Sequence, residues 1–221
     1  MPHDENHPTI AVLGGTGKEG PALALRWAFA GYPVIIGSRQ AEKAQATATE
    51  LNAKLGTNLV RGMENNAAAL AADICVLTVV YTAHEAAIEN LHEALQGKIL
   101  IDATARIDFR DPRPPAPPSA ARLAQQSLGL GVRVVAAFQN VPAHTLRNNL
   151  GSSLETDVLV FSDDLRAADE AIKLAEAGGM RGYYAGGLDT AIVAEGLTAM
   201  LISVNKHYKT KTASIRVAGL S

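Results

Sequence analysis

The feature that most constrains this chain is a glycine-rich turn between an apolar run and an alanine-rich helix pattern. Ile10–Leu13 has the composition of a short strand, and residues 15–20 then follow the pattern G-x-G-x-x-G. Residues 21–30 continue as a predicted helix, so the motif has the strand–turn–helix context of a dinucleotide-binding site. A glycine-rich turn without that context needs no ligand, so the flanking elements carry the prediction.

The three glycines of this motif each have a predicted role. Gly15 lets the chain turn off the strand, Gly17 lets the backbone approach a pyrophosphate, and Gly20 lets the helix pack closely on the strand. The unpaired N–H groups at the helix start then face the phosphates, and the helix dipole favours their negative charge. The turn therefore predicts a dinucleotide at the start of the chain.

Strand and helix patterns alternate along the rest of the sequence. Further strands are predicted at residues 32–37, 73–80, 98–102, 132–138 and 157–161, with short or uncertain strands at 58–60 and 183–186. Helices are predicted at residues 40–55, 65–72, 83–95, 119–126, 165–177 and 189–204. This series predicts an α/β fold with a Rossmann-type, doubly wound, mostly parallel sheet.

We expect a dinucleotide-binding domain at residues 1–145. A small C-terminal α/β extension at residues 146–221 would pack on it, completing a second-substrate site and a dimer interface.

The residues after the second predicted strand favour NADP(H) over NAD(H). An NAD site normally places an acidic residue about 20 residues after the first glycine, where it accepts from the ribose 2′-hydroxyl. Here Ser38 and Arg39 stand at that offset, and Lys43 follows one helical turn later. A hydroxyl and two cations suit a 2′-phosphate, because charge-assisted hydrogen bonds to phosphate are strong. The alternative is an ordinary solvated helix start, where cations are unfavourable unless an anion is near.

Composition and charge argue against several other classes of protein. The chain has 221 residues and a net charge of −2, which gives no basis for binding nucleic acid. No fully apolar run approaches the ~18 residues of a membrane span. The polar start lacks the pattern of a secretion signal, so we expect a cytoplasmic protein that does not bind membranes. Cys75 lies in an apolar run and is expected to be a buried hydrophobe. No cysteine–histidine cluster has zinc spacing, so we expect no metal.

The carboxyl ends of the predicted strands are expected to form the ligand crevice. Thr78, Val79 and Val80 end the fourth strand, and we expect them to line the route toward the nicotinamide. Residues 136–144 end a later strand on the same side, and their amides and small apolar side chains suit a flat polar heterocycle. His144 in this segment is more typical of a surface or capping position than of a catalyst.

The sequence offers no arrangement of acid, base or nucleophile. Little more than one helix follows Gly187, so a second substrate is expected to dock on the nucleotide-binding domain itself, over the nicotinamide. A hydride transfer between two organic coenzymes needs no catalytic side chain, because the coenzymes carry the chemistry and the protein sets their distance and facing. We therefore predict no catalytic residue.

Three segments resemble a known enzyme family. GGTGKEGPALALRWAFAGYPVIIGSRQAEKA is similar to the opening of the NADPH-dependent reductases of coenzyme F420, which is an 8-hydroxy-5-deazaflavin. The likeness continues in RVVAAFQNVPAHTL and in AEGLTAMLISVNKHYKTKTASIRVAGL, so it spans nearly the whole chain. The resemblance implies hydride exchange between NADP(H) and the deazaflavin C5, and a homodimer.

The resemblance also assigns residues to the two coenzymes. With the positions already derived, the residues expected to bind NADP(H) are Gly15, Thr16, Gly17, Lys18, Glu19, Gly20, Ser38, Arg39, Lys43, Thr78, Val79, Val80 and Ala137. Those expected near the deazaflavin are Gln139, Asn140, Val141, Pro142 and Ala143, and Arg106 is a candidate for its acidic tail. The tail cations Lys206, Lys209, Lys211 and Arg216 are further candidates, with a solvated basic tail as the alternative.

Two turns depart from the family pattern near the expected deazaflavin position. The chain reads Ala105-Arg106-Ile107 where the family often has an apolar, proline-containing turn. It reads VVYTAH after Thr78, where a proline followed by tryptophan is common. These departures keep two alternatives open: a reductase of another flat acceptor such as a flavin or quinone, and a non-catalytic NADP-sensing protein.

Two segments have two interpretations each. Residues 106–118 contain five prolines, which exclude helix and central strand, so this stretch is either a linker or a flap bordering the site. The helix predicted at residues 189–204 carries a broad apolar stripe, which is either core or half of a dimer interface.

Overall fold

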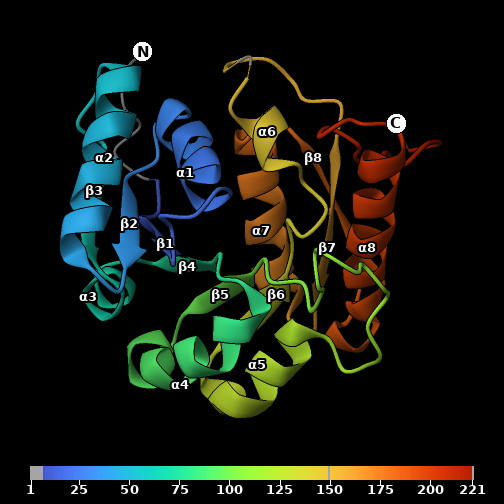
Figure 1. Ribbon diagram of the computed structural model, residues 1–221. Coiled ribbons are helices and arrows are strands. Elements are labelled where there is room, and N and C mark those ends of the chain that lie inside the picture. Colours follow the sequence, from blue (N-terminus) through green and yellow to red (C-terminus); the bar gives the residue numbers. More distant parts are fainter. Residues whose placement is uncertain (1–6, 149, 221) are drawn as a thin grey trace.

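The fold is a single sheet covered by helices on both faces (Figure 1). The computed structural model describes residues 7–148 and 150–220. Within them the strands are β1 (Ile10–Leu13), β2 (Val34–Ser38), β3 (Val60–Glu64), β4 (Ile74–Leu77), β5 (Ile99–Asp102), β6 (Arg133–Ala136), β7 (Asp157–Ser162) and β8 (Arg181–Gly186). Positions 1–6, 149 and 221 lie outside the described residues. Positions 1–6 are part of the polar start from which we expected no secretion signal.

The strand order confirms the predicted Rossmann-type architecture. Within the described residues the sheet runs β3-β2-β1-β4-β5-β6-β7-β8. Strands β1 to β6 pair in parallel, whereas β7 is antiparallel to β6 and parallel to β8. The order reverses at β1, where β2 lies on one side and β4 on the other, and open α/β sheets bind ligands at such a point.

The helices connect these strands and begin within three residues of their predicted starts, except α6, which the sequence pattern did not predict. They are α1 (Gly20–Phe29), α2 (Ala41–Leu55), α3 (Asn65–Leu70), α4 (His84–Leu95), α5 (Ala120–Leu128), α6 (Ala143–Leu146), α7 (Leu165–Ala177) and α8 (Ile192–His207), with short 3₁₀ turns η1 (Tyr81–Ala83), η2 (Gly129–Gly131) and η3 (Leu188–Thr190). The Ser119 hydroxyl accepts from the Arg122 N–H at 3.1 Å and caps α5. The Asp164 carboxylate accepts from the Ala167 N–H at 2.9 Å and caps α7.

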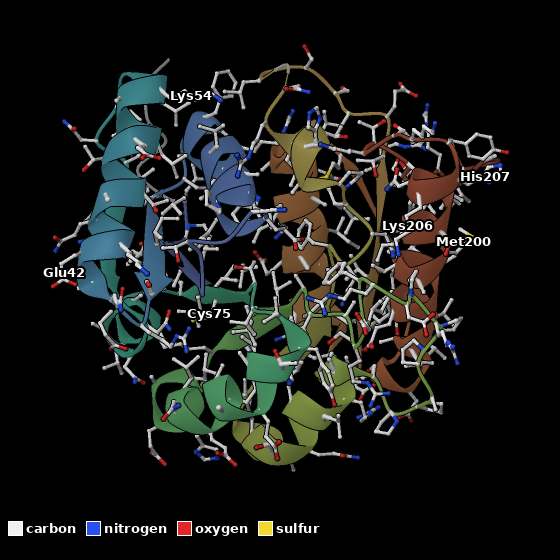
Figure 2. All side chains as sticks on the ribbon, in the orientation of Figure 1. Glu42, Lys54, Cys75, Met200, Lys206 and His207 are labelled. Carbon is white, nitrogen blue, oxygen red and sulfur yellow. The ribbon has the colours of Figure 1, made fainter. Side chains whose placement is uncertain are left out.

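Alternate residues of each central strand point into two separate cores. Ile10 and Val12 of β1 pack on one face of the sheet with α1, α2 and α7. Ala11 and Leu13 pack on the other face with α3, α4, α5 and the start of α8. Both faces are apolar because a parallel sheet with helices on each side has no solvated surface. Cys75 lies in the second core, fully buried as expected, and Figure 2 shows it within the sheet.

The C-terminal part of the chain is bound to α1 by buried hydrogen bonds. The Arg26 guanidinium donates to the carbonyl oxygens of Leu146, Asn148 and Gly178. The Trp27 indole N–H donates to the Leu174 carbonyl at 2.8 Å. Strands β7 and β8 therefore extend the same sheet and the same core, and the boundary between residues 145 and 146 stays a prediction.

Helix α8 is apolar and lies at the edge of the molecule beside β7 (Figure 1). By length and composition alone Leu188–His207 could span a membrane, with a mean hydropathy of 1.3. Glu195 in its middle is buried, however, and Leu188 and Ala194 belong to the second core. One face of α8 therefore belongs to the core, which was one of the two interpretations of its apolar stripe. Val193 and Met200 remain about half exposed.

The sixth strand ends earlier than the sequence predicts, and the reason is a backbone conformation. Residues 132–138 read as one apolar strand, but β6 ends at Ala136 because Phe138 has φ = +74°. This left-handed conformation is rare for residues other than glycine. The Phe138 ring is buried and meets Trp27 edge-on, with ring centroids 5.7 Å apart. The buried ring holds the turn, which carries residues 139–143 over the carboxyl end of the sheet.

Candidate active site

Two clefts meet at the carboxyl ends of β1 and β4. The first, here called the dinucleotide cleft, has a volume of about 580 Å³. It is lined by Gly14, Thr16, Gly17, Ser38, Arg39, Gln40, Lys43, Glu64, Asn65, Asn66, Thr78, Val79, Val80, Ala83, Ala86, Ala87, Asn90 and Leu91. The sequence-predicted residues Ser38, Arg39 and Lys43 therefore share one cleft with the glycine turn, although they lie on β2 and at the start of α2.

The glycine turn is open at Gly17 and closely packed at Gly15 and Gly20. A Cβ at Gly17 would meet no atom within 4 Å, so this backbone is open to a ligand. A Cβ at Gly20 would lie 2.7 Å from the Gly15 Cα, and one at Gly15 would lie 2.5 Å from the Val12 carbonyl oxygen. Gly15 and Gly20 therefore permit close packing and line neither cleft, while the positive φ of +68° falls on Gly14.

The glycine turn is also supported by a residue that lies far from it in the sequence. The Asn65 side-chain oxygen accepts from the Gly14 N–H at 3.1 Å. Gly15 N–H donates to the Gly37 carbonyl at 2.8 Å, which fixes the turn against the end of β2. Sequence reasoning missed Asn65, Asn66 and Glu64, although the polar run at the start of a short helix after a strand was the available signal.

The second cleft has a volume of about 620 Å³ and is mostly apolar. Its lining residues are Gly17, Lys18, Glu19, Thr78, Val79, Val80, Tyr81, Ala103, Ala105, Phe109, Gln139, Asn140, Val141, Pro142, Ala143, Thr198, Leu201, Ile202, Asn205, Lys211 and Ala213. It shares Gly17, Thr78, Val79 and Val80 with the dinucleotide cleft. The two clefts are therefore continuous along the end of β4.

The segment predicted to face the second substrate does line this cleft. Gln139 donates from its side-chain nitrogen to the Asp102 carbonyl at 2.9 Å, while its side-chain oxygen has no partner. Asn140 is turned toward α8, where its nitrogen donates to the Ala194 carbonyl and the Thr198 hydroxyl. Ala137 lines neither cleft because it is fully buried in the first core, and His144 is exposed on α6.

A buried pair supports the turn after β5, from which Ala103 and Ala105 line the second cleft. His84 Nε2 lies 2.7 Å from Asp102 Oδ2, and both side chains are almost completely buried. Burial lowers the pKa of His84, but the hydrogen bond and the negative charge of Asp102 outweigh it, with smaller effects from Glu195 and Glu85. The pKa of His84 is therefore raised. The other Asp102 oxygen accepts from the Thr104 N–H at 2.9 Å, so the pair fixes the turn after β5.

Arg106 does not line the second cleft, contrary to its assignment as a candidate for the acidic tail. Its side chain lies against buried Glu195, 3.6 Å away, and also donates to the Ala116 carbonyl. Glu195 accepts from the N–H groups of Arg106 and Ala120 at 2.9 and 2.6 Å, and burial raises its pKa. Arg106 therefore pairs with a buried carboxylate on α8. This contact between residues 89 positions apart cannot be recognised from the sequence alone.

The proline-rich segment lies along α8 and borders the second cleft. Phe109 lines the cleft, and the Lys206 ammonium donates to the Arg110 carbonyl at 3.0 Å. Figure 2 shows Lys206 on the side of α8 toward this segment and Met200 on the outer side. Of the basic tail residues, Lys211 lines the cleft, whereas Arg216 pairs with Glu155.

No candidate metal centre accompanies these clefts. Among residues 7–148 and 150–220 no group of three or more histidine, cysteine or acidic side chains is placed to hold a metal ion. Burial raises the pKa of the Cys75 thiol to about 12, so this cysteine is not a thiolate ligand near neutral pH.

The fold and its two joined clefts define a Rossmann-type, nucleotide-dependent oxidoreductase. Residues 9–106 match the family described as NADP oxidoreductase, coenzyme F420-dependent. The F420-dependent NADP reductase of Methanothermobacter marburgensis is 41% identical, with 96% of this chain and 98% of that protein covered. The enzyme of the same name from Methanocaldococcus jannaschii is 36% identical with the same coverage. The chain belongs to this family of F420-dependent NADP reductases.

Solved structures with lower sequence identity confirm the fold. A hypothetical protein from Sinorhizobium meliloti has a TM-score of 0.67 at 24% identity, over 86% of this chain and 88% of that one. A pyrroline carboxylate reductase from Plasmodium falciparum, solved with NADP bound, has a TM-score of 0.59 at 14% identity, over 91% and 67% of the two chains.

Proposed function

We propose that this protein transfers a hydride between NADP(H) and coenzyme F420. The observation that carries the proposal is the continuity of the two clefts at Gly17, Thr78, Val79 and Val80. A dinucleotide that begins at Arg39 and crosses the glycine turn would end at this junction. A second flat molecule in the apolar cleft would then lie against the reactive ring of the first.

The residues of the dinucleotide cleft fit a phosphorylated ligand. The open backbone at Gly17 admits a pyrophosphate, and the start of α1 presents its N–H groups there. Ser38, Arg39 and Lys43 line the other end, where two cations favour a 2′-phosphate. The coenzymes supply the hydride chemistry when bound, and these side chains supply position and charge.

The residues of the second cleft would exclude water and hold the ring of the acceptor. Val79, Val80, Leu201 and Ile202 give it apolar walls, and the unpartnered oxygen of Gln139 offers an acceptor for a ring or amide N–H. Exclusion of water favours hydride transfer, because the two rings must touch without solvent between them. We assign no catalytic side chain.

We also propose that the enzyme is a cytoplasmic homodimer. Val193 and Met200 on the outer side of α8 are large apolar residues that are about half exposed, and a second copy of the chain would cover them as a homodimer. The division into residues 1–145 and 146–221, and a cytoplasmic location, are part of the same proposal.

The test of this function is a direct mixing experiment. Purified protein with NADPH and F420 should remove the visible absorbance of the oxidised deazaflavin, with NADPH consumed in equal amounts. Flavins and quinones should react far more slowly under the same conditions. Turnover of those acceptors without F420 would support the other reductase, and tight NADPH binding without any turnover would support a sensing protein.

A further inference from the structure

We propose that Glu19 acts as a neutral carboxylic acid, donating a hydrogen bond to an acceptor oxygen on the nicotinamide half of the dinucleotide. The inference rests on the proposed NADP(H) binding and adds to it the protonation state of one residue. Glu19 immediately precedes α1 and lies in the glycine turn, two residues after Gly17.

Glu19 lines the second cleft and follows Gly17, a residue that both clefts share, by two positions. It lines the second cleft together with Gly17, Thr78, Val79 and Val80, which also line the dinucleotide cleft. It does not line the dinucleotide cleft, which contains Arg39 and Lys43. Its carboxyl group would therefore lie beside the nicotinamide half of a bound dinucleotide rather than the adenosine half.

The carboxyl group has no partner that would hold it ionised. Its Oε1 is buried without a hydrogen bond, and among the described residues no ion pair involves Glu19. Burial alone raises its pKa to about 8. The neutral acid offers one O–H donor.

The charged and titratable groups around Glu19 come from four segments. Lys18 is its neighbour in the turn, and the Arg147 side chain, which follows α6, donates to the Lys18 carbonyl at 2.9 Å. Tyr81 of η1 and Lys211 of the tail line the same cleft. None of these groups lowers the pKa of Glu19, which depends on burial alone.

The experiment measures the affinity for NADPH between pH 7 and 9.5, where the 2′-phosphate is already fully ionised. The wild type should bind about tenfold more weakly at pH 9 than at pH 7 and should take up a proton above pH 8, as calorimetry in buffers of different ionisation enthalpy would show. Glu19→Gln keeps a neutral donor of the same shape, so its affinity should be independent of pH. Glu50→Gln, which replaces an exposed acid on α2, should behave as the wild type does.

A truncated ligand locates the contact. Adenosine 2′,5′-bisphosphate lacks the nicotinamide half, so its affinity should not change with pH in any variant. The proposal is overturned if wild-type affinity for NADPH is flat with pH, if Glu19→Gln shows the same decline, or if the bisphosphate does. Normal NADPH binding at pH 7 in each case would show that the proposed NADP(H) binding, on which this inference rests, still stands.

Discussion

The dinucleotide cleft and the second cleft share four residues, yet they are built in different ways. The dinucleotide cleft is formed where β1, β2, β3 and β4 end and by the helices that follow β2, β3 and β4, and its lining residues occur within the first 91 positions. The second cleft joins η1, the loop after β5, residues 139–143, α8 and the tail. Local backbone geometry makes the first, whereas buried polar contacts between distant segments hold the second together.

The largest change in stability is expected when the buried contacts of Glu195, which join α8 to the loop after β5, are removed. Glu195→Ala should reduce the free energy of unfolding by about 3–5 kcal/mol, because two buried N–H groups and Arg106 lose their partner. Urea unfolding measures this change, with Glu50→Ala as the exposed control on α2. A loss below about 1 kcal/mol would show that α8 is held mainly by its apolar contacts.

Two glycines of the turn should separate binding from folding. Gly17→Val should weaken NADPH binding at least about 100-fold, or about 2.8 kcal/mol, with unchanged thermal stability, because its side chain meets only ligand space. Gly20→Ala should instead destabilise the fold by about 1–3 kcal/mol, since its Cβ would meet Gly15 and Thr78. Equal loss of stability in both variants would contradict the open position of Gly17.

The adenosine end of the dinucleotide cleft should discriminate between the two nicotinamide dinucleotides. Arg39→Ala should weaken NADPH by about 1.5–3 kcal/mol, typical of a lost charged hydrogen bond, and leave NADH nearly unchanged. Arg166→Ala, an exposed arginine on α7, is the matched control. Isothermal titration with both dinucleotides decides the point, because equal losses would show that Arg39 does not contact the 2′-phosphate.

The smallest expected effect is a pH dependence of the free energy of unfolding, which arises from the buried pair of His84 and Asp102. The raised pKa of His84 means that its stabilisation is complete below about pH 6.5, the value in the unfolded chain, and is lost as pH rises through the higher folded value. We expect a decrease of about 1 kcal/mol in wild-type stability, which His84→Asn should remove. Both should be measured in a Glu19→Gln background, since Glu19 titrates in the same range.

Eight of the residues expected to bind NADP(H) line the dinucleotide cleft, because the patterns that identify them are local. The glycine turn, the cations after β2 and the apolar strands can each be recognised within a few residues of one another. The Ser119 and Asp164 caps are equally local, because each side chain accepts from an N–H three residues later in the chain. The parallel sheet follows from the alternation of these local patterns.

The second cleft was only partly predictable because its walls depend on packing between distant segments. Residues 139–143 line it as expected, but the left-handed Phe138 that turns them depends on a ring buried against Trp27. Arg106 was a candidate for the acidic tail of the deazaflavin. Its backbone N–H donates to Glu195, 89 residues later, and its side chain lies 3.6 Å from that carboxylate. Thr198, Leu201 and Ile202 became lining residues only because β7 and β8 carry α8 back over the sheet.

The distribution of the second cleft along the chain has a consequence for synthesis on the ribosome. A nascent chain that has emerged as far as β8 already contains every residue of the dinucleotide cleft, but it lacks α8 and Lys211, which form one wall of the second cleft. Synthesis therefore completes the lining of the dinucleotide cleft before that of the second cleft.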